Sequence, residues 1–205
     1  MSRVLVAGIG NVFLADDGFG VEVARRMARS GPPEGVRVAD YGIRGVHLAY
    51  ELLDGRTDTL IMVDAVPVEG PPGTLAVIEV DGAAVDEAMA GLDPSDPLGP
   101  PAVDGHGMNP VAVLRTLRRL GGEIGRVLVV GCRPAVIEER MELSEPVRAV
   151  LDDAVRLVTD LARDEAEREE ANREEVDRED AGRDGPGRDE TGAGGANTSR
   201  ERTHA

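Results

Sequence analysis

The side chains best suited to chemistry in this sequence are carboxylates and one imidazole. Asp16 and Asp17 follow an apolar run that breaks at a glycine-rich turn. Asp64 ends the apolar run TLIMV, and His106 lies between two glycines. Carboxylate oxygens and an imidazole nitrogen are donors suited to a borderline divalent metal such as nickel, zinc or manganese. The residue types therefore indicate a metal or acid–base centre, provided that the fold brings them together.

Each of these residues also has a structural explanation. An aspartate at a helix start is favoured by the helix dipole by roughly 0.5–1 kcal/mol, which explains one member of the acidic pair but does not require both. An aspartate at a strand end can cap a turn, and a single loop histidine is usually exposed. We assign Asp16 mainly to the helix cap, with a role as catalytic base as its alternative. Asp17, Asp64 and His106 are the candidate functional set.

The elements that would position these residues alternate along the chain. Short β-branched runs bounded by glycine predict buried strands, and apolar residues repeating every three or four positions predict helices with one apolar face. Residues 82–105 are predicted to form a surface loop with one short helical turn. The predicted strands are 3–9, 36–41, 59–63, 74–80 and 126–130, and the predicted helices are 19–30, 46–53, 110–120 and 144–162.

This alternation is typical of an α/β fold. We predict a three-layer α/β/α sandwich, with a five-stranded, mostly parallel, twisted sheet and helices on both faces. The connection that follows Asp64 is too short for a parallel crossover, so the strand at 74–80 is predicted to be an antiparallel edge strand. Open sheets bind ligands beyond the carboxyl ends of their strands. At this edge we expect residues 8–17, 42–45, Asp64 and His106.

The totals restrict the kinds of partner. A chain of 205 residues suits one domain, and a net charge of −16 argues against nucleic acid and an anionic membrane as partners. The single cysteine, Cys132, excludes an internal disulfide, and we expect a buried, inert thiol. Neither a secretory signal nor an apolar stretch of about 20 residues is evident. We expect a cytoplasmic monomer.

The apolar pattern stops at Ala162. We therefore predict a folded domain over 1–162 and a charged, low-complexity tail over 163–205. Arginine recurs at every fifth position from Arg163 to Arg188, a period that matches neither a helix face nor a strand face. The tail is predicted to be largely disordered, with a solvated helical extension as the alternative for its first part.

A dinucleotide site is an alternative explanation of the glycine-rich turn. Gly8 and Gly10 match the first two glycines of G-x-G-x-x-G, but Phe13 occupies the third position, where a side chain obstructs helix–strand packing. The acidic pair would also repel a pyrophosphate, which binds at the positive end of a helix. A P-loop is excluded because the chain has no lysine. We rank a nucleotide-binding module last.

The glycine-rich stretch is also similar to a known family. Residues 4–21, VLVAGIGNVFLADDGFGV, resemble the opening G-x-G-N-x-x-x-x-D-[DE]-x-x-G of the hydrogenase maturation endopeptidases, which remove a C-terminal peptide from the large subunit of nickel–iron hydrogenases. Two later segments agree in order and spacing, LIMVDAV at 60–66 and His106 before an amphipathic helix, and VLVVGCRPA followed by MELSEPV is similar to the family's final segment. The resemblance covers residues 3–162.

The resemblance implies which residues carry the activity. The family's metal-binding triad falls on Asp17, Asp64 and His106, which are also the implied catalytic residues. The family's second loop usually reads D-G-G-T-x-G. Gly42 and Gly45 are retained here as the implied substrate loop, whereas Ile43 replaces the threonine.

The function implied by the resemblance is that of an aspartic-type endopeptidase. It would remove the C-terminal extension of a nickel–iron hydrogenase large-subunit precursor after nickel insertion. Nickel would be supplied by this precursor, the implied partner, and another divalent metal could occupy the site in the isolated protein. The alternative is a non-catalytic nickel-binding maturation chaperone that docks on the large subunit.

Overall fold

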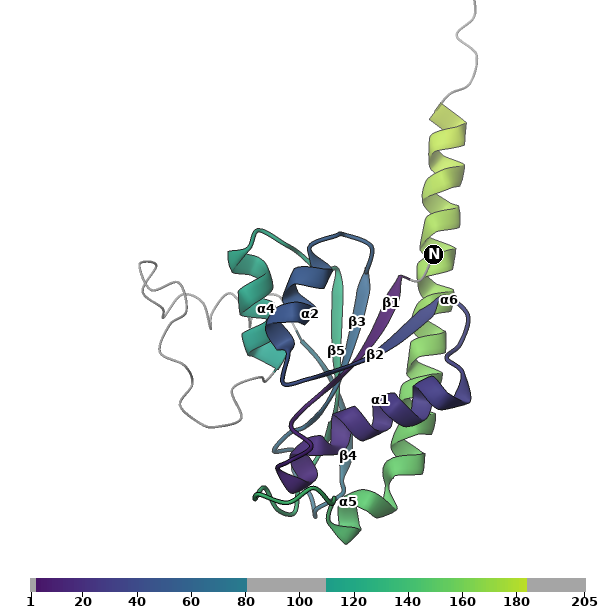
Figure 1. The fold of residues 1–205 in the computed structure, drawn as a ribbon. Coiled ribbons are helices and arrows are strands. Elements are labelled where there is room, and N and C mark those ends of the chain that lie inside the picture. Colours follow the sequence, from purple (N-terminus) through teal and green to yellow (C-terminus); the bar gives the residue numbers. More distant parts are fainter. Residues whose placement is uncertain (1–2, 81–109, 184–205) are drawn as a thin grey trace, which may run out of the picture. The chain divides into compact units, whose positions relative to one another are not determined.

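A computed structural model describes residues 3–80 and 110–183, with side chains described to residue 178. Within these ranges five strands form one sheet in the order β2-β1-β3-β5-β4 (Figure 1). The strands are β1 (Val4–Ile9), β2 (Val36–Gly42), β3 (Thr59–Ala65), β4 (Leu75–Glu79) and β5 (Arg126–Cys132). The helices are the 3-10 turn η1 (Ala15–Gly18), α1 (Phe19–Ser30), α2 (Gly45–Leu52), α4 (Pro110–Arg119), α5 (Glu145–Ala149) and α6 (Leu151–Arg183).

The sheet is parallel except at one edge. β1 pairs in parallel with β2 and β3, and β3 pairs in parallel with β5. β4 runs antiparallel to β5, with Leu75 opposite Cys132, so the predicted antiparallel edge strand is confirmed. The central strands β1 and β3 are buried almost throughout, as expected of strands covered on both faces.

Helices cover both faces of the sheet (Figure 1). Along β1, Val4 and Val6 join a core that includes residues of α1 and α6, whereas Leu5 and Ala7 join a core with residues of α2 and α4. This division follows from the two-residue period of a strand, which sends successive side chains to opposite faces. The predicted three-layer α/β/α sandwich is therefore confirmed.

The chain order creates a crevice between β1 and β3. From β1 the chain goes to β2 on one side and then returns to form β3 on the other side of β1. Such a reversal of strand order opens a crevice beyond the carboxyl ends of the two strands, where open α/β sheets bind ligands. Asp17 lies shortly after β1, and Asp64 lies at the end of β3.

Helix α1 begins directly above this crevice. A Cβ atom on Gly20 would overlap the carbonyl oxygens of Val63 and Ile9. A Cβ atom on Gly8 would overlap the carbonyl oxygen of Gly20 and the Ala24 side chain. Glycine at positions 8 and 20 therefore permits the helix to rest on the strand ends, and the turn that carries the acidic pair is placed over the crevice.

Helix α6 is longer than the apolar pattern predicted. The first compact unit extends to Ala171, beyond the predicted boundary at 162, and the helix continues to Arg183 in a second unit that starts at Asn172. The remainder of the predicted tail, from residue 184, and the predicted loop at 82–105 lie outside the described residues. No helix in the described ranges is long and apolar enough to cross a membrane.

Polar contacts attach α6 to the sheet after its apolar stripe ends. Glu165 is only 6% exposed and forms an ion pair with Arg126 at the start of β5. The hydroxyl of Thr59, at the start of β3, donates to Glu169 at 3.0 Å. The spacing of apolar residues contains no information about such polar contacts. This explains why the apolar pattern placed the end of the domain at residue 162.

We predict that Gly20→Ala destabilises the protein although alanine is the better helix former. The added methyl group would meet two backbone carbonyls that cannot rotate away, and overpacking of this kind costs about 1–3 kcal/mol. Urea unfolding measures the free energy. Ala28→Ser, on the exposed face of the same helix, is the control and should change it by less than about 0.5 kcal/mol. Equal stability of the two variants would contradict the close packing.

Candidate active site

The loop after β1 holds Asp17 in place. The backbone N–H of Asn11 donates to Asp17 Oδ2 at 2.7 Å, and the side-chain oxygen of Asn11 accepts a hydrogen bond from the N–H of Phe13 at 3.0 Å. The second bond closes a turn of the kind that asparagine forms with the residue two positions on. Asp17 is 8% exposed, so its carboxylate is largely shielded from solvent and is oriented by the loop itself.

Gly10 permits Asp17 and Asp64 to lie close together. Its φ angle is +124°, and a Cβ atom there would overlap the carbonyl oxygen of Asp17 and lie 3.8 Å from Asp64 Oδ1. Only glycine combines this backbone angle with so little space. Two carboxylates predicted from separate strand ends are thus brought into one site.

Asp64 is the more deeply buried member of the pair. It is 5% exposed, and its Oδ1 accepts a hydrogen bond from the N–H of Ala65 at 2.8 Å. Burial is the main cause that raises its pKa from 3.8 to about 8, and the negative charge of Asp17 adds to the rise. The Ala65 hydrogen bond opposes the shift without cancelling it. Asp64 therefore carries a proton at neutral pH.

The loop after β2 is joined to the loop after β1. The N–H of Gly10 donates to the carbonyl oxygen of Gly42 at 3.1 Å, and Gly42 has a φ angle of +53°. Gly45 is buried at the first position of α2, while Ile43 between the two glycines is 62% exposed. The described contacts thus bring Gly42, but not Gly45, against the site loop and leave the Ile43 side chain accessible.

His106 lies outside the described residues, so the third member of the triad stays a prediction. Within 3–80 and 110–178, no group of three or more His, Cys, Asp and Glu side chains is arranged to hold a metal. The described donors for a metal are therefore Asp17 and Asp64. Two carboxylates beside a glycine fit a divalent cation, because the cation would offset their mutual repulsion and the burial of their charge.

The prediction that Asp16 caps a helix is wrong. Neither η1 nor α1 has a side-chain hydrogen bond at its cap. Asp16 is instead fully buried, and its two oxygens accept four hydrogen bonds from the segment between β5 and α5. The donors are the N–H groups of Ala135 (2.8 Å), Val136 (3.0 Å) and Ser144 (2.6 Å) and the Ser144 hydroxyl (2.8 Å). With both oxygens engaged, Asp16 is poorly suited to act as the catalytic base.

Cys132 and Phe13 do not form part of the candidate chemistry. Cys132 is 1% exposed in β5; burial, followed by the charge of Asp16, raises the pKa of its thiol to about 12. A thiol held neutral in this way is not a nucleophile, which agrees with the expected buried, inert cysteine. Phe13 is 62% exposed on the loop after β1, so its side chain is kept out of the contact between α1 and the sheet.

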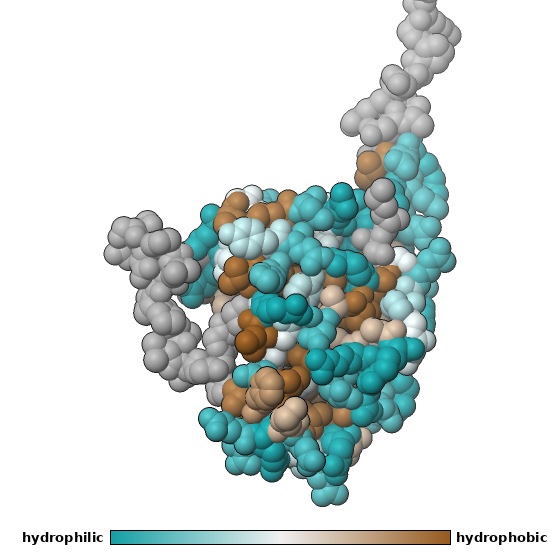
Figure 2. Space-filling view, in the orientation of Figure 1, coloured by the Kyte–Doolittle hydropathy of each residue, from teal (hydrophilic) through white to brown (hydrophobic). Residues whose placement is uncertain are grey.

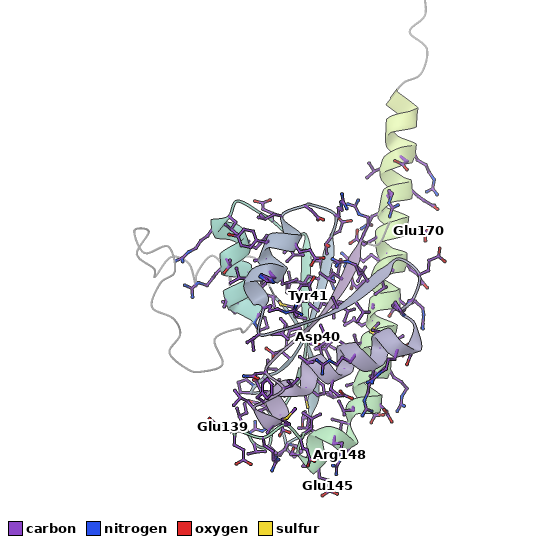
Figure 3. The ribbon with its side chains drawn as sticks, viewed as in Figure 1. Asp40, Tyr41, Glu139, Glu145, Arg148 and Glu170 are labelled. Atoms are coloured by element: carbon purple, nitrogen blue, oxygen red, sulfur yellow. The ribbon has the colours of Figure 1, made fainter. Side chains whose placement is uncertain are left out.

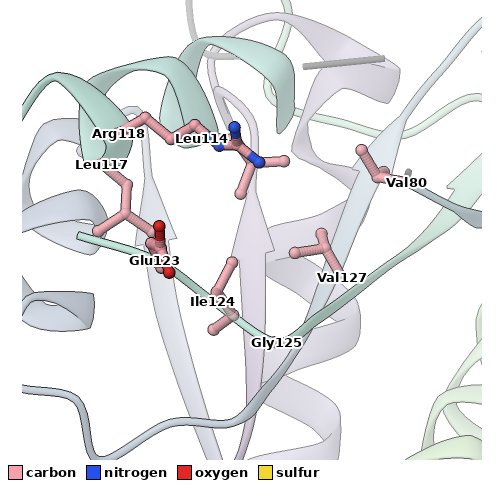
Figure 4. A pocket seen from close by; sticks show the side chains of 8 residues that line it. All are labelled: Val80, Leu114, Leu117, Arg118, Glu123, Ile124, Gly125 and Val127. Atoms are coloured by element: carbon pink, nitrogen blue, oxygen red, sulfur yellow. The ribbon is translucent and has the colours of Figure 1, made fainter. Parts of the chain in front are cut away.

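A separate cavity lies between α4 and the start of β5 (Figure 4). Its volume is about 220 Å³, and its wall includes Leu114 and Leu117 of α4 together with Val127 of β5. Because β5 begins at Arg126 and is parallel to β3, this cavity is near the edge of the sheet opposite to Asp64. It is therefore not part of the candidate active site.

Two residues of the glycine-rich motif, Asn11 and Gly20, support the site although the sequence assigned no role to either. Asn11 orients Asp17 through its backbone and fixes the loop through its side chain. An asparagine directly after a glycine turn was the available signal. Gly20 permits the approach of α1 to the sheet, and its signal was a glycine inside a predicted helix, where glycine costs stability unless close packing requires it.

The fold and the paired aspartates define an α/β protein with an acidic centre at the crevice of its sheet, suited to acid–base or metal-assisted hydrolysis. The profile of the hydrogenase maturation protease family matches residues 21–161. This match spans most of the chain, and the protein belongs to that family. It is accordingly an endopeptidase, as the resemblance of residues 4–21 implied.

Relatives and solved structures agree with this assignment. A hydrogenase expression/formation protein of Azotobacter chroococcum is 34% identical over 157 residues, which cover 76% of this chain and 69% of that protein. A hydrogenase 2 maturation peptidase from a Thaumarchaeota archaeon superposes with a TM-score of 0.56 at 32% identity, covering 78% of this chain and 97% of that one. The hydrogenase maturating endopeptidase HybD of Escherichia coli gives a TM-score of 0.61 at 25% identity, with 80% and 93% covered.

The raised pKa of Asp64 predicts a pH-dependent stability. The unfolded chain loses this proton near pH 4 whereas the folded chain keeps it until about pH 8, so the contribution of Asp64 to stability falls as the pH rises through this interval. Asp64→Asn removes the effect. The melting temperature of the variant relative to that of the wild type should therefore rise between pH 4 and pH 8, by on the order of 10 °C.

Thermal unfolding in metal-free buffer at pH 4, 5, 6, 7 and 8 measures this difference. Asp164→Asn, which changes an exposed carboxylate on α6, is the control and should leave the wild-type profile unaltered. A constant difference between Asp64→Asn and the wild type across the series would show that Asp64 ionises normally in the folded protein.

Proposed function

We propose that this protein removes the C-terminal extension of a nickel–iron hydrogenase large-subunit precursor after nickel has been inserted. Asp17, Asp64 and His106 would contact the nickel carried by the precursor, so nickel is part of the substrate. The observation that carries the proposal is the pair of buried aspartates next to Gly10 in a chain of the maturation protease family. The single cysteine fits processing in the reducing cytoplasm.

The protonation of Asp64 supplies a physical basis for metal sensing. Without a cation, Asp64 keeps its proton at neutral pH because burial and Asp17 disfavour a second negative charge. A precursor that brings a divalent cation favours the ionised carboxyl, and the proton leaves to solvent. A metallated precursor would thus gain two charged contacts that an empty precursor cannot form.

Asp17 is the group best placed to handle protons during hydrolysis. Its Oδ2, which accepts a hydrogen bond from the N–H of Asn11, would also contact the nickel, and Oδ1 would accept a proton from the attacking water. The same carboxyl can then pass this proton to the nitrogen of the leaving peptide, so that one water is consumed for each bond cleaved. Gly42, tied to Gly10, would present backbone groups to the substrate chain.

Nickel dependence is the first prediction of this proposal. Purified precursor loaded with nickel should lose its C-terminal peptide, whereas the precursor without nickel should be cleaved at least about tenfold more slowly, because it lacks the charge that favours ionised Asp64. Mass spectrometry of the large subunit before and after incubation follows the reaction. Equal rates with and without nickel would refute metal sensing, while absence of any cleavage would favour the docking chaperone.

His106→Ala should abolish processing of the nickel-loaded precursor. The predicted role is direct contact with the metal, so the rate should fall by at least about a hundredfold while the melting temperature stays near that of the wild type. His47→Ala is the matched control because His47 is exposed on α2. If the His106→Ala protein processed the precursor at the wild-type rate, His106 would not be part of the active site.

A further inference from the structure

Asp16 is the acidic side chain that the fold buries most completely. Hydrophilic residues cover much of the surface in the space-filling view (Figure 2), where their charges are in contact with water. Among the acidic side chains of the described ranges, Asp16 alone is 0% exposed. Removing a carboxylate from water costs free energy unless hydrogen bonds replace its hydration. The four hydrogen bonds described above replace it, and they therefore fix Asp16 firmly to its donors.

The donors to Asp16 belong to the chain that leaves β5, the strand paired with β3. Asp64 at the end of β3 lies opposite Gly131, and the first donor is Ala135, shortly after the end of β5. The turn η1 itself lies against β3. In Figure 3 the labelled Glu139 marks this connection at the same end of the molecule as the start of α1. Asp16 therefore spans the end of β3, from the loop after β1 to the chain after β5.

Backbone hydrogen bonds reinforce the same connection. The N–H of Asp16 donates to the carbonyl oxygen of Val136 at 3.3 Å, opposite to the bond that Val136 donates to the Asp16 side chain. The N–H of Ala15 donates to the carbonyl oxygen of Arg140 at 2.5 Å, and the N–H of Arg140 donates to the carbonyl oxygen of Phe13 at 3.0 Å. The turn is thus attached to the chain after β5 through side chain and backbone together.

The backbone angle at Ala15 indicates that these contacts hold the turn in place. The φ angle of Ala15 is +51°, in the left-handed region that alanine rarely adopts. Such a conformation persists only where the surrounding structure enforces it. The hydrogen bond of Ala15 to Arg140 and the bonds of the next residue, Asp16, are the contacts that enforce it. Without them the turn would be expected to relax to a different course.

Asp17 depends on this attachment. Its N–H donates to the carbonyl oxygen of Leu14 at 3.2 Å, and its Oδ2 accepts a hydrogen bond from the N–H of Asn11 at 2.7 Å. Among the described residues, the bonds of this N–H and this carboxylate stay inside the loop after β1, so they fix Asp17 to its loop and not to β3. The distance from Asp17 to Asp64 therefore depends on how the loop is attached to the rest of the protein.

We propose that Asp16 is a positioning residue that sets the place of Asp17 relative to Asp64. By spanning the end of β3, Asp16 holds the acidic turn over the crevice, so that the two carboxylates keep the separation that hydrolysis requires. The inference rests on the proposed function, in which Asp17 handles protons and both carboxylates contact the metal. It adds the residue that aligns them. The competing explanation is that packing of α1 on the sheet suffices and that Asp16 contributes stability alone.

Asp16→Asn tests this role in processing assays with nickel-loaded precursor. The amide is close in shape to the carboxyl but turns one acceptor oxygen into a donor that faces N–H groups, so the turn should shift. Displacement of a reacting group slows the chemical step more than it weakens substrate binding. We expect kcat to fall at least about thirtyfold while KM changes less than about threefold. A fall in kcat of less than about threefold would overturn the inference.

Position 144 provides a milder test, which stays informative if Asp16→Asn does not fold. Ser144→Ala removes the hydroxyl bond to Asp16 and leaves the three N–H bonds, so kcat should fall about threefold. Ser144→Thr retains the hydroxyl and should keep the wild-type kcat. The Ser144 hydroxyl forms no cap bond with α5, so loss of helix capping does not account for a difference. Equal kcat values for the two variants would contradict the positioning role.

A stability control separates positioning from general destabilisation. Glu165→Gln alters another buried carboxylate, which is paired with Arg126 at the start of β5. This variant should have a lower melting temperature and an unaltered kcat in assays run well below that temperature. If Glu165→Gln lost kcat to the same extent as Asp16→Asn, loss of stability would explain both results and the inference would be refuted.

Hydrogen exchange of the protein alone judges the inference independently of the precursor. In Asp16→Asn and Ser144→Ala, exchange should become faster at Ala135 and Val136, and also at Asn11, whose N–H is bound to Asp17; in Asp16→Asn we expect about tenfold. A role in stability alone predicts faster exchange at the donors with wild-type exchange at Asn11, and that pattern would overturn the inference. If the wild-type protein left nickel-loaded precursor uncleaved, the proposed function would fail, and exchange at Asn11 would still decide whether Asp16 positions Asp17.

Discussion

The contact between the first turn of α1 and the ends of β1 and β3 is the constraint on which the site depends. Since Gly20 has no side chain, the helix rests on the carbonyl oxygens of the strand ends, and the turn η1 is pressed over the crevice. Carboxylates placed there lose most of their water. Each one compensates differently: Asp16 accepts four hydrogen bonds, Asp17 accepts one from its own loop, and Asp64 retains a proton.

Two consecutive aspartates therefore perform unrelated tasks. Full satisfaction of its hydrogen-bonding capacity makes Asp16 a strong structural link and a poor base. Among the described residues Asp17 accepts one hydrogen bond, at Oδ2, and its charge helps to set the protonation of Asp64. The difference arises from the tight 3-10 geometry of η1, in which adjacent side chains leave the backbone about a third of a turn apart.

The sequence predicted the layers, the antiparallel edge strand and the two carboxylates at neighbouring strand ends, because periodicity and strand termini are local features. It could not predict the partners of Asp16, which lie 119 or more residues further along the chain. The apolar pattern also did not predict that the folded unit continues past Ala162. The reason is related: Glu165 is held by an ion pair and not by apolar packing. The place of His106 in the site stays a prediction.

The length of the loop between Gly10 and Asp17 is a structural requirement in its own right. Gly10 must pass close to the Asp17 backbone and Asp16 must meet its donors in residues 135–144, so both ends of the loop are fixed in register. An insertion or deletion of a single codon would exchange the directions of the two carboxylates or leave one without donors. Point changes at exposed positions such as Phe13 can be accommodated by the backbone, whereas a frame-preserving indel here would be expected to eliminate the site. Among homologues, gaps in an alignment should therefore avoid this stretch even where its residue types vary.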